Sequence, residues 1–356
     1  MQRYTLEISN FYLIIAIMQR VEKGKILMIV TLAMLLAGCA GSRSFVSFEV
    51  LEPAEITYPE NVSKVGYLNR APLSIHSFSE INQSGLDPIA LRIVDSTICN
   101  NLRRGFNEGR QLTELTYLKE IPLYNSRRTD TINKASLLDA FSRQRIFRNA
   151  GTDVDALVVL EYYYIDMVRS YPSFDFMVGD YIEEFRLKMN VLWRIYAKDR
   201  ESPVDEYLQQ DTLFYMNRQS MPSSGYLNPA DVLRDGSQEM GFRYGLRHIP
   251  KWEVVSRVIF RGGSPELKAA AELTDQGAWD EAAGVWVPLI RHEDNKIAAR
   301  ACHNLAVHYE LLDDIVTASN YINRAEKLWD NETTEAYSKV LEKRLYNKQV
   351  LLKQVR

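Results

Sequence analysis

The sequence lacks the cysteine pairs, phosphate loops and hydrolase motifs that would point to a familiar chemistry. Only 3 cysteines occur among 356 residues, and no two of them form a Cys-x-x-Cys pair. A redox exchange centre and a zinc knuckle, which both rely on such pairs, are therefore excluded. Neither Gly-x-Ser-x-Gly nor Gly-x-x-x-x-Gly-Lys-Ser/Thr is present, so the chain offers no serine-hydrolase elbow and no phosphate loop.

The sequence also lacks a large excess of charge of either sign. It has 43 Lys and Arg side chains against 46 Asp and Glu, which gives a formal net charge of −3. A mildly acidic chain has no general attraction for nucleic acid or anionic lipid, so we expect no nucleic-acid partner. The residues are 46% hydrophobic and 11% aromatic, which supports a packed core.

Histidine is scarce, with 5 in the chain. His303 and His308 are five residues apart in a predicted helix, so they do not share a face as the i, i+4 pair of a zinc site does. We expect the histidines to be solvated or packing side chains, and we predict no metal, no cofactor and no catalytic residue. Cys99 and Cys302 lie in apolar helical segments, where buried free thiols are expected.

A secretion signal stands at the amino terminus. Basic side chains at residues 20–25 precede an apolar run at residues 26–37, and Gly follows that run directly before Cys39. A basic region, a short apolar region and small residues are the parts of a secretory signal. The apolar run is too short for the ~20 residues that span a bilayer. Met18 begins a signal of normal length, so residues 1–17 are compatible with a misplaced start codon.

The ending Leu-Ala-Gly-Cys resembles the lipobox of bacterial lipoproteins. This resemblance implies that Cys39 carries lipid, that residues 1–38 are removed as a signal peptide, and that residues 39–44 are the lipidated cysteine and its tether. Several acyl chains hold a protein on a membrane without a spanning helix. The residues after Cys39 lack the acidic run that resembles a surface-export signal, so we expect a cell-envelope protein in the outer membrane, facing the periplasm.

Residues 45–261 alternate between strand and helix patterns, which predicts an α/β layered domain on a mixed sheet. The apolar run at residues 155–167 gives the strongest strand, and Tyr181–Tyr196 with Tyr207–Met216 predict an antiparallel pair. The other predicted strands are residues 45–51, 64–69 and 253–260. The predicted helices begin at Asp87-Pro88, at Ser136 and, after the cap Asn228, at Pro229.

From Ser264 onward the pattern becomes purely helical. Two segments repeat at a spacing of 36 residues, and the second of them resembles a tetratricopeptide repeat. Pro288 falls inside the second helix of the first repeat, where proline normally ends or kinks a helix. Residues 264–356 therefore predict an all-α tetratricopeptide-like tail of helical hairpins, and the fold class of the whole chain is α+β.

Two further resemblances concern location and architecture. Residues 60–165 look like the small α/β domain of several envelope lipoproteins, including curli-secretion modules and modules similar to the TolB amino-terminal domain. The whole chain resembles a Bacteroidetes family of lipoproteins, on the basis of the lipobox, the segment at residues 53–59 followed by Asn69-Arg70, and the helical tail. These resemblances imply a place in the envelope but no activity.

The first functional hypothesis is a non-enzymatic scaffold for protein interaction or assembly. Tetratricopeptide stacks present a groove to peptides or proteins, so the tail is expected to bind a partner in this way. Asn304, His308 and Tyr309 are the predicted contacts, with His308 at a position of the exposed type. A related hypothesis is a subunit of a secretion or assembly machine, which predicts ring-like oligomers.

A second hypothesis is a glycan-binding module or hydrolase of the envelope. Tyr162 and Tyr164 share one face of a strand and could form an aromatic platform, beside the polar loop at residues 217–225. Glu183 and Glu184 cannot act as a catalytic pair, because adjacent strand residues point to opposite faces. Separately, Asp130-Thr131-Ile132 resembles the Bacteroidetes pattern for O-glycosylation and makes Thr131 a candidate modification site.

Overall fold

The chain forms two compact units. The computed structural model describes residues 42–71, 93–109, 118–120, 137–149, 154–175, 177, 179–219 and 227–355. The helical unit comprises the described residues up to Val50 together with Val254–Tyr346, and the sheet unit comprises Leu51–Glu253 with the residues from Asn347 onward. The predicted division after residue 261 differs from this one, because most of β1 (Arg43–Glu52) and β7 (Lys251–Phe260) belongs with the helices.

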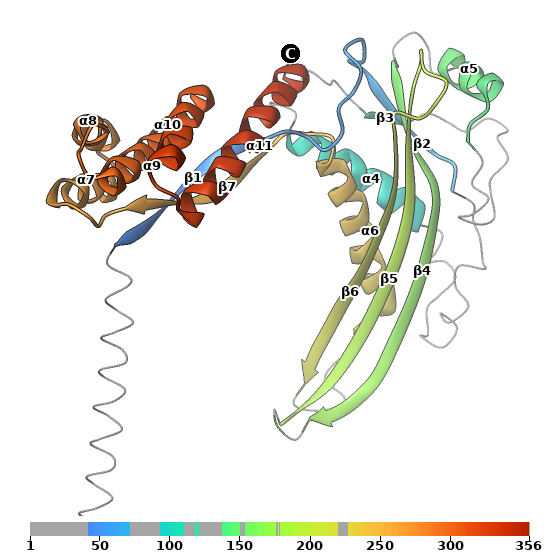
Figure 1. The fold of residues 1–356 in the computed structure, drawn as a ribbon. Coiled ribbons are helices and arrows are strands. Elements are labelled where there is room, and N and C mark those ends of the chain that lie inside the picture. Colours follow the sequence, from blue (N-terminus) through green and yellow to red (C-terminus); the bar gives the residue numbers. More distant parts are fainter. Residues whose placement is uncertain are drawn as a thin grey trace, which may run out of the picture. The chain divides into compact units, whose positions relative to one another are not determined.

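The sheet unit is built on a five-stranded mixed sheet, so the α+β class is confirmed. The strand order is β3-β2-β4-β5-β6, with β2 parallel to β3 and β4, and with β5 antiparallel to both β4 and β6 (Figure 1). These strands are β2 (Val65–Asn69), β3 (Leu118–Glu120), β4 (Ala156–Asp175), β5 (Asp180–Ala197) and β6 (Asp205–Gln219). The predicted antiparallel pair is therefore present, while β4 runs eight residues beyond the predicted end at Met167.

Two helices cover one face of this sheet. They are α4 (Val94–Glu108) and α6 (Pro229–Leu246), and their apolar side chains meet those of the three long strands in the main core (Figure 1). As predicted, Asn228 caps α6, with its Oδ1 accepting from the Ala230 N–H at 2.9 Å. The two helices touch through backbone, because a Cβ added at Gly241 would lie 2.0 Å from the Ile98 carbonyl oxygen. Glycine is thus required for this close approach.

The opposite face of the sheet is covered only in part. Helix α5 (Ala140–Asn149) places Ile146 and Phe147 against Leu157, Val159 and Tyr196, which form a second, smaller core. Further along β5 and β6, exposed residues alternate with buried or half-buried ones, so the exposed side chains lie on this face of the sheet. A sheet with one packed face and one open face explains the alternating apolar and polar pattern that made these strands predictable.

The helical unit contains successive helices joined by short turns and the two-stranded sheet of β1 and β7. The helices are α7 (Pro265–Asp275), α8 (Trp279–Leu289), α9 (Asn295–Leu311), α10 (Ile315–Leu328) and α11 (Glu332–Gln354). The sequence repeat has a structural counterpart, since α8 and α10 begin 36 residues apart. Pro288 ends α8 one residue later, as its missing N–H predicts.

Small side chains allow these helices to pack closely. Ala270, Ala271, Ala282, Ala301, Ala306 and Ala318 are fully buried around Trp286 in the core of this unit. Turns between the helices use left-handed backbone at Gly277, with φ 78°, and at Asp313, with φ 56°. In the part of the chain that the structure describes, no helix is both long and apolar enough to cross a membrane.

Several predictions fall on residues that the structure does not describe. These are the signal at residues 1–38, the lipidated Cys39, the candidate glycosylation site Thr131, the helix start at Asp87-Pro88 and most of the loop at 217–225.

Candidate functional site: an aromatic surface on the helical unit

Asn304, a predicted groove contact, is buried and bound to the chain's own strand β7. Its side-chain N–H donates to the Phe260 carbonyl oxygen at 2.9 Å, and its Oδ1 accepts from the Phe260 N–H at 2.8 Å. A side-chain amide that pairs with both backbone groups of one residue takes the place of a neighbouring β-strand. Asn304 is therefore a structural residue here, and an accessible groove does not include it.

Other side chains of α9 hold the same strand. His303 Nε2 lies 3.1 Å from the Val258 carbonyl oxygen, and the Glu310 carboxylate accepts two hydrogen bonds of 2.7 Å from the Arg257 guanidinium. The Tyr337 hydroxyl also donates to Glu310, at 2.7 Å. This side of α9 binds an extended segment, but that segment belongs to the protein itself.

Burial keeps His303 neutral. Desolvation lowers its pKa to about 3, and the Val258 carbonyl, which favours the charged form, only partly offsets this effect. A neutral ring with its proton on Nε2 donates to Val258 and accepts at Nδ1 from the Thr334 hydroxyl, 3.2 Å away. Both ring nitrogens are then satisfied without a charge.

Stability is expected to fall as the pH drops below about 6.5. The unfolded chain takes up protons on histidine from about pH 6.5, whereas folded His303 does so only near pH 3. The stabilisation is therefore complete above pH 6.5 and is lost progressively toward pH 3, by about 1.4 kcal/mol per pH unit for this one group. Urea unfolding of the wild type and of His303→Gln at pH 7, 6 and 5 measures this loss. The variant should show a shallower pH slope, and equal slopes would contradict the assignment.

A partly exposed aromatic cluster lies on the other part of α9. His308 is buried, which corrects the expectation that it is exposed, and its ring lies 5.2 Å from that of Tyr309 and 6.5 Å from that of Trp279. Tyr309 in turn stacks on Tyr321 of α10 at 5.4 Å, with the rings 11° from parallel. We call Trp279, His308, Tyr309 and Tyr321 the aromatic surface. The three members other than His308 are half-buried.

An acidic side chain borders the aromatic surface. The Asp280 carboxylate lies 3.8 Å from His308 Nε2, and the Asp280 side chain is 94% exposed. Burial lowers the pKa of His308 although Asp280 acts to raise it, so the ring is neutral near pH 7. The aromatic surface is thus uncharged and has an acidic rim. The sequence predicted His308 and Tyr309 as contacts, and the structure adds Trp279 and Tyr321 to them.

A buried ionic cluster in the sheet unit was the other strong candidate for a site. Glu161 occupies a β-bulge in β4, and it binds Arg70 at 2.6 Å and the Tyr196 hydroxyl at 2.9 Å, with Arg194 at 3.7 Å. Burial raises the pKa of Glu161, against the opposing effect of the two guanidinium groups. Because these charges are mutually neutralised inside the fold, we assign the cluster a structural role.

The same cluster explains the Asn69-Arg70 motif noted in the sequence. While Arg70 binds Glu161, the Asn69 side chain donates to Asp95 at 2.6 Å, and its Oδ1 accepts from the Ala71 N–H at 3.0 Å. Asn69 therefore ties the end of β2 to the first turn of α4. The motif positions the strand and helix of this unit.

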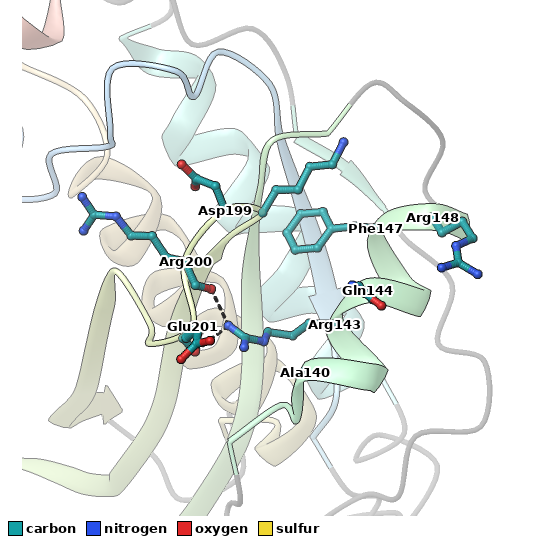
Figure 2. Close-up of a pocket in the computed structure, with 9 residues that line it drawn as sticks. Ala140, Arg143, Gln144, Phe147, Arg148, Asp199, Arg200 and Glu201 are labelled. Atoms are coloured by element: carbon teal, nitrogen blue, oxygen red, sulfur yellow. Dashed lines mark hydrogen bonds between the residues drawn. The ribbon is translucent and has the colours of Figure 1, made fainter.

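A hollow of about 690 Å³ lies between α5 and the turn that joins β5 to β6, and Figure 2 shows the side chains that line it. The Arg143 guanidinium donates to the backbone carbonyls of Arg200 and Glu201 and so ties the helix to the turn. The walls of the hollow carry both cationic and acidic side chains: Arg143, Arg148, Lys198, Asp199, Arg200 and Glu201. This mixture favours no single class of ligand.

The structure leaves little support for the glycan or hydrolase hypothesis. Tyr162 and Tyr163 are buried, so they cannot form an exposed platform, although Tyr162 and Tyr164 do share one cluster. Glu183 is buried and bound to Arg169 at 2.6 Å, while Glu184 is exposed on the opposite face, as predicted. Cys99 and Cys302 are buried free thiols, also as predicted, and the pKa of Cys302 is raised by burial to about 11. Among the described residues, no group of side chains is suited to hold a metal ion.

Comparisons with known proteins divide the chain near the Gly262-Gly263 turn. One family model, described as Domain of unknown function (DUF8603), matches residues 110–260, and another, Domain of unknown function (DUF6340), matches residues 268–347. No curated protein matches the chain. Among solved structures, a chain of the PelC dodecamer from Paraburkholderia phytofirmans is similar at 10% identity and a TM-score of 0.23, over 57% of this chain and 97% of that chain. So distant a likeness carries no argument about function.

Proposed function

We propose that this protein is a lipid-anchored, non-enzymatic scaffold of the cell envelope, attached through Cys39. Its helical unit binds a protein or peptide partner. The observation that carries the proposal is the aromatic surface, where Trp279, Tyr309 and Tyr321 are half-buried around a neutral His308. Tyrosine and tryptophan are enriched at protein interfaces, because each offers a large apolar body with a polar tip.

The chemistry of this surface indicates the kind of partner. Stacked rings favour an apolar or aromatic side chain, since a second ring can pack against their edges or faces. The exposed carboxylate of Asp280 favours a basic residue beside it. We therefore propose a partner segment that carries an apolar residue next to a lysine or arginine.

Crosslinking in intact envelopes, followed by affinity purification and mass spectrometry, tests this proposal. We expect the double variant Trp279→Ala/Tyr321→Ala to lose at least tenfold of its captured partner, because residues at the centre of an interface typically contribute 2 kcal/mol or more. The matched control is Tyr346→Ala, which removes a 66% exposed tyrosine from α11 of the same unit. Partner capture that is unchanged in a folded double variant, or equally reduced in the control, would refute the proposed surface.

Point variants are preferable to deletion of residues 264–356. The deletion would remove Asn304 and Glu310, which bind β7, and it would also remove the final turns of α11 from the sheet unit. In those turns Gln354 exchanges hydrogen bonds of 2.8 and 3.0 Å with the backbone of Ala54. Loss of a partner after such a deletion would not distinguish a missing surface from a damaged fold.

A further inference from the structure

Strand β6 forms an edge of the five-stranded sheet. It pairs with β5 along its whole length, from the pair Asp205 with Ile195 to the pair Gln219 with Tyr181. Among the described residues, no other strand pairs with its second edge. An unpaired edge presents a row of backbone donors and acceptors to any strand that can lie beside it. This edge is 15 residues long, against a usual strand length of about 5 or 6.

Strand β6 lacks several of the devices that normally protect such an edge, although it carries the charged side chains Asp205, Glu206, Asp211 and Arg218. Its sequence contains no proline, no glycine and no lysine, and its pairing with β5 shows no bulge. Natural edge strands use these features to prevent association with other chains. Apolar side chains are exposed instead, with Phe214 at 74%, Met216 at 53% and Leu208 at 40%.

The open face of β6 is self-complementary. When two copies of Asp205–Gln219 pair antiparallel over their full length, the residue at the centre of each, Thr212, lies opposite its own copy. In this register Glu206 lies opposite Arg218 of the other copy, and Leu208 lies opposite Met216. These two pairs match in character, and opposite charges or apolar side chains placed directly across two strands stabilise the pairing. The third pair of this face, Gln210 opposite Phe214, is not matched.

From this edge and this pattern, we propose that two copies of the protein associate through β6, in a two-fold symmetric dimer centred on Thr212. The two sheets continue into one another, and Leu208, Phe214 and Met216 of each copy cover one another on the open face. The interface is isologous, which means that the same patch on each copy serves both sides and the assembly closes at two chains. The dimer does not depend on the partner proposed for the helical unit.

Disulfide trapping of the full-length protein, purified in detergent, tests this arrangement. Residues directly opposite in an antiparallel pair have Cα atoms about 4.5–5.5 Å apart, which a disulfide can bridge. We expect Thr212→Cys to form a disulfide-linked dimer under mild oxidation. Gln210→Cys is the matched control: it is exposed on the same face, but in this register its two copies are about 14 Å apart and should stay unlinked.

Light scattering gives the particle mass and the strength of association. Two chains per particle are expected, and Arg218→Glu should raise the dissociation constant about 5- to 30-fold, because two like-charge pairs replace two opposite ones. Adding Glu206→Lys to that variant should restore association, with circular dichroism confirming that each variant is folded. A monomer at tens of micromolar, a larger ring, or equal crosslinking at residues 210 and 212 would each overturn the proposal.

Discussion

Replacing Glu310 by alanine is expected to lower the free energy of unfolding by about 3–5 kcal/mol. The Glu310 carboxylate is buried, and it accepts two hydrogen bonds from Arg257 and one from Tyr337, while Arg344 lies 3.5 Å away. Removal of the carboxylate leaves the buried Arg257 guanidinium without its counter-charge. An uncompensated charge in an apolar interior is among the most destabilising changes that a single substitution can make.

Urea unfolding followed by circular dichroism measures this loss. The matched control is Glu335→Ala, which removes an exposed ion pair with Lys339 from α11 and should leave the free energy of unfolding nearly unchanged. Arg257→Met together with Glu310→Ala should recover part of the stability, because the charge of Arg257 is then removed and Arg344 still has Asp313 at 3.5 Å. A cost below 1 kcal/mol for Glu310→Ala would show that the carboxylate does not hold β7 to α9.

Replacing Gly241 by valine is expected to cost about 3 kcal/mol or more. Gly241 faces α4 at such short range that an added Cβ would lie 2.0 Å from the Ile98 carbonyl oxygen and 3.0 Å from the Leu102 nitrogen. These are backbone atoms, so the contact cannot be relieved by a change of rotamer, and the two helices must move apart. Overpacking of this kind typically costs 1–3 kcal/mol, and separating two helices of the main core adds the loss of their packing.

Gly284, in contrast to Gly241, has room for a larger side chain. It lies inside α8, it is exposed, and an added Cβ would meet nothing within 4 Å. Gly284→Ala should therefore raise the free energy of unfolding by about 0.5–1 kcal/mol, through the helix propensity of alanine alone. Thermal unfolding that ranks Gly284→Ala above the wild type and Gly241→Val well below it would confirm both assignments. Destabilisation by Gly284→Ala would contradict the placement of Gly284 at an exposed position inside α8.

Much of the fold follows from local patterns in the sequence. The alternation of Tyr181–Tyr196 and Tyr207–Met216 predicted β5 and β6, because an open sheet face leaves every second residue polar. The cap Asn228 and the following proline predicted the start of α6, and Pro288 predicted the end of α8. These features depend only on neighbouring residues, so one sequence was enough to place them.

Other features depend on residues that are distant in the chain. The bulge at Glu161 reverses the alternation of β4, so Leu160 and Tyr163 enter the same core, which a strict period of two forbids. No local sequence pattern predicts that bulge, because the side chains that bind Glu161 there are the distant Arg70 and Tyr196. For the candidate site, the repeat pattern led to α9, but it could not show that β7 already binds Asn304. His308 was predicted to be exposed, because one sequence could not show that Trp279 of α8 lies beside its ring.

The pairing of β1 with β7 has a mechanical consequence if the chain is held at Cys39. Tension on the tether would enter the structure at Arg43, the first residue of β1, and would act on the ladder that joins β1 to β7. β7 is in turn fastened to α9 by Asn304, His303 and Glu310. A load applied at the membrane would therefore be carried first by the helical unit. The side chains of α9 that bind β7 would then transmit this load from the strand to the helices.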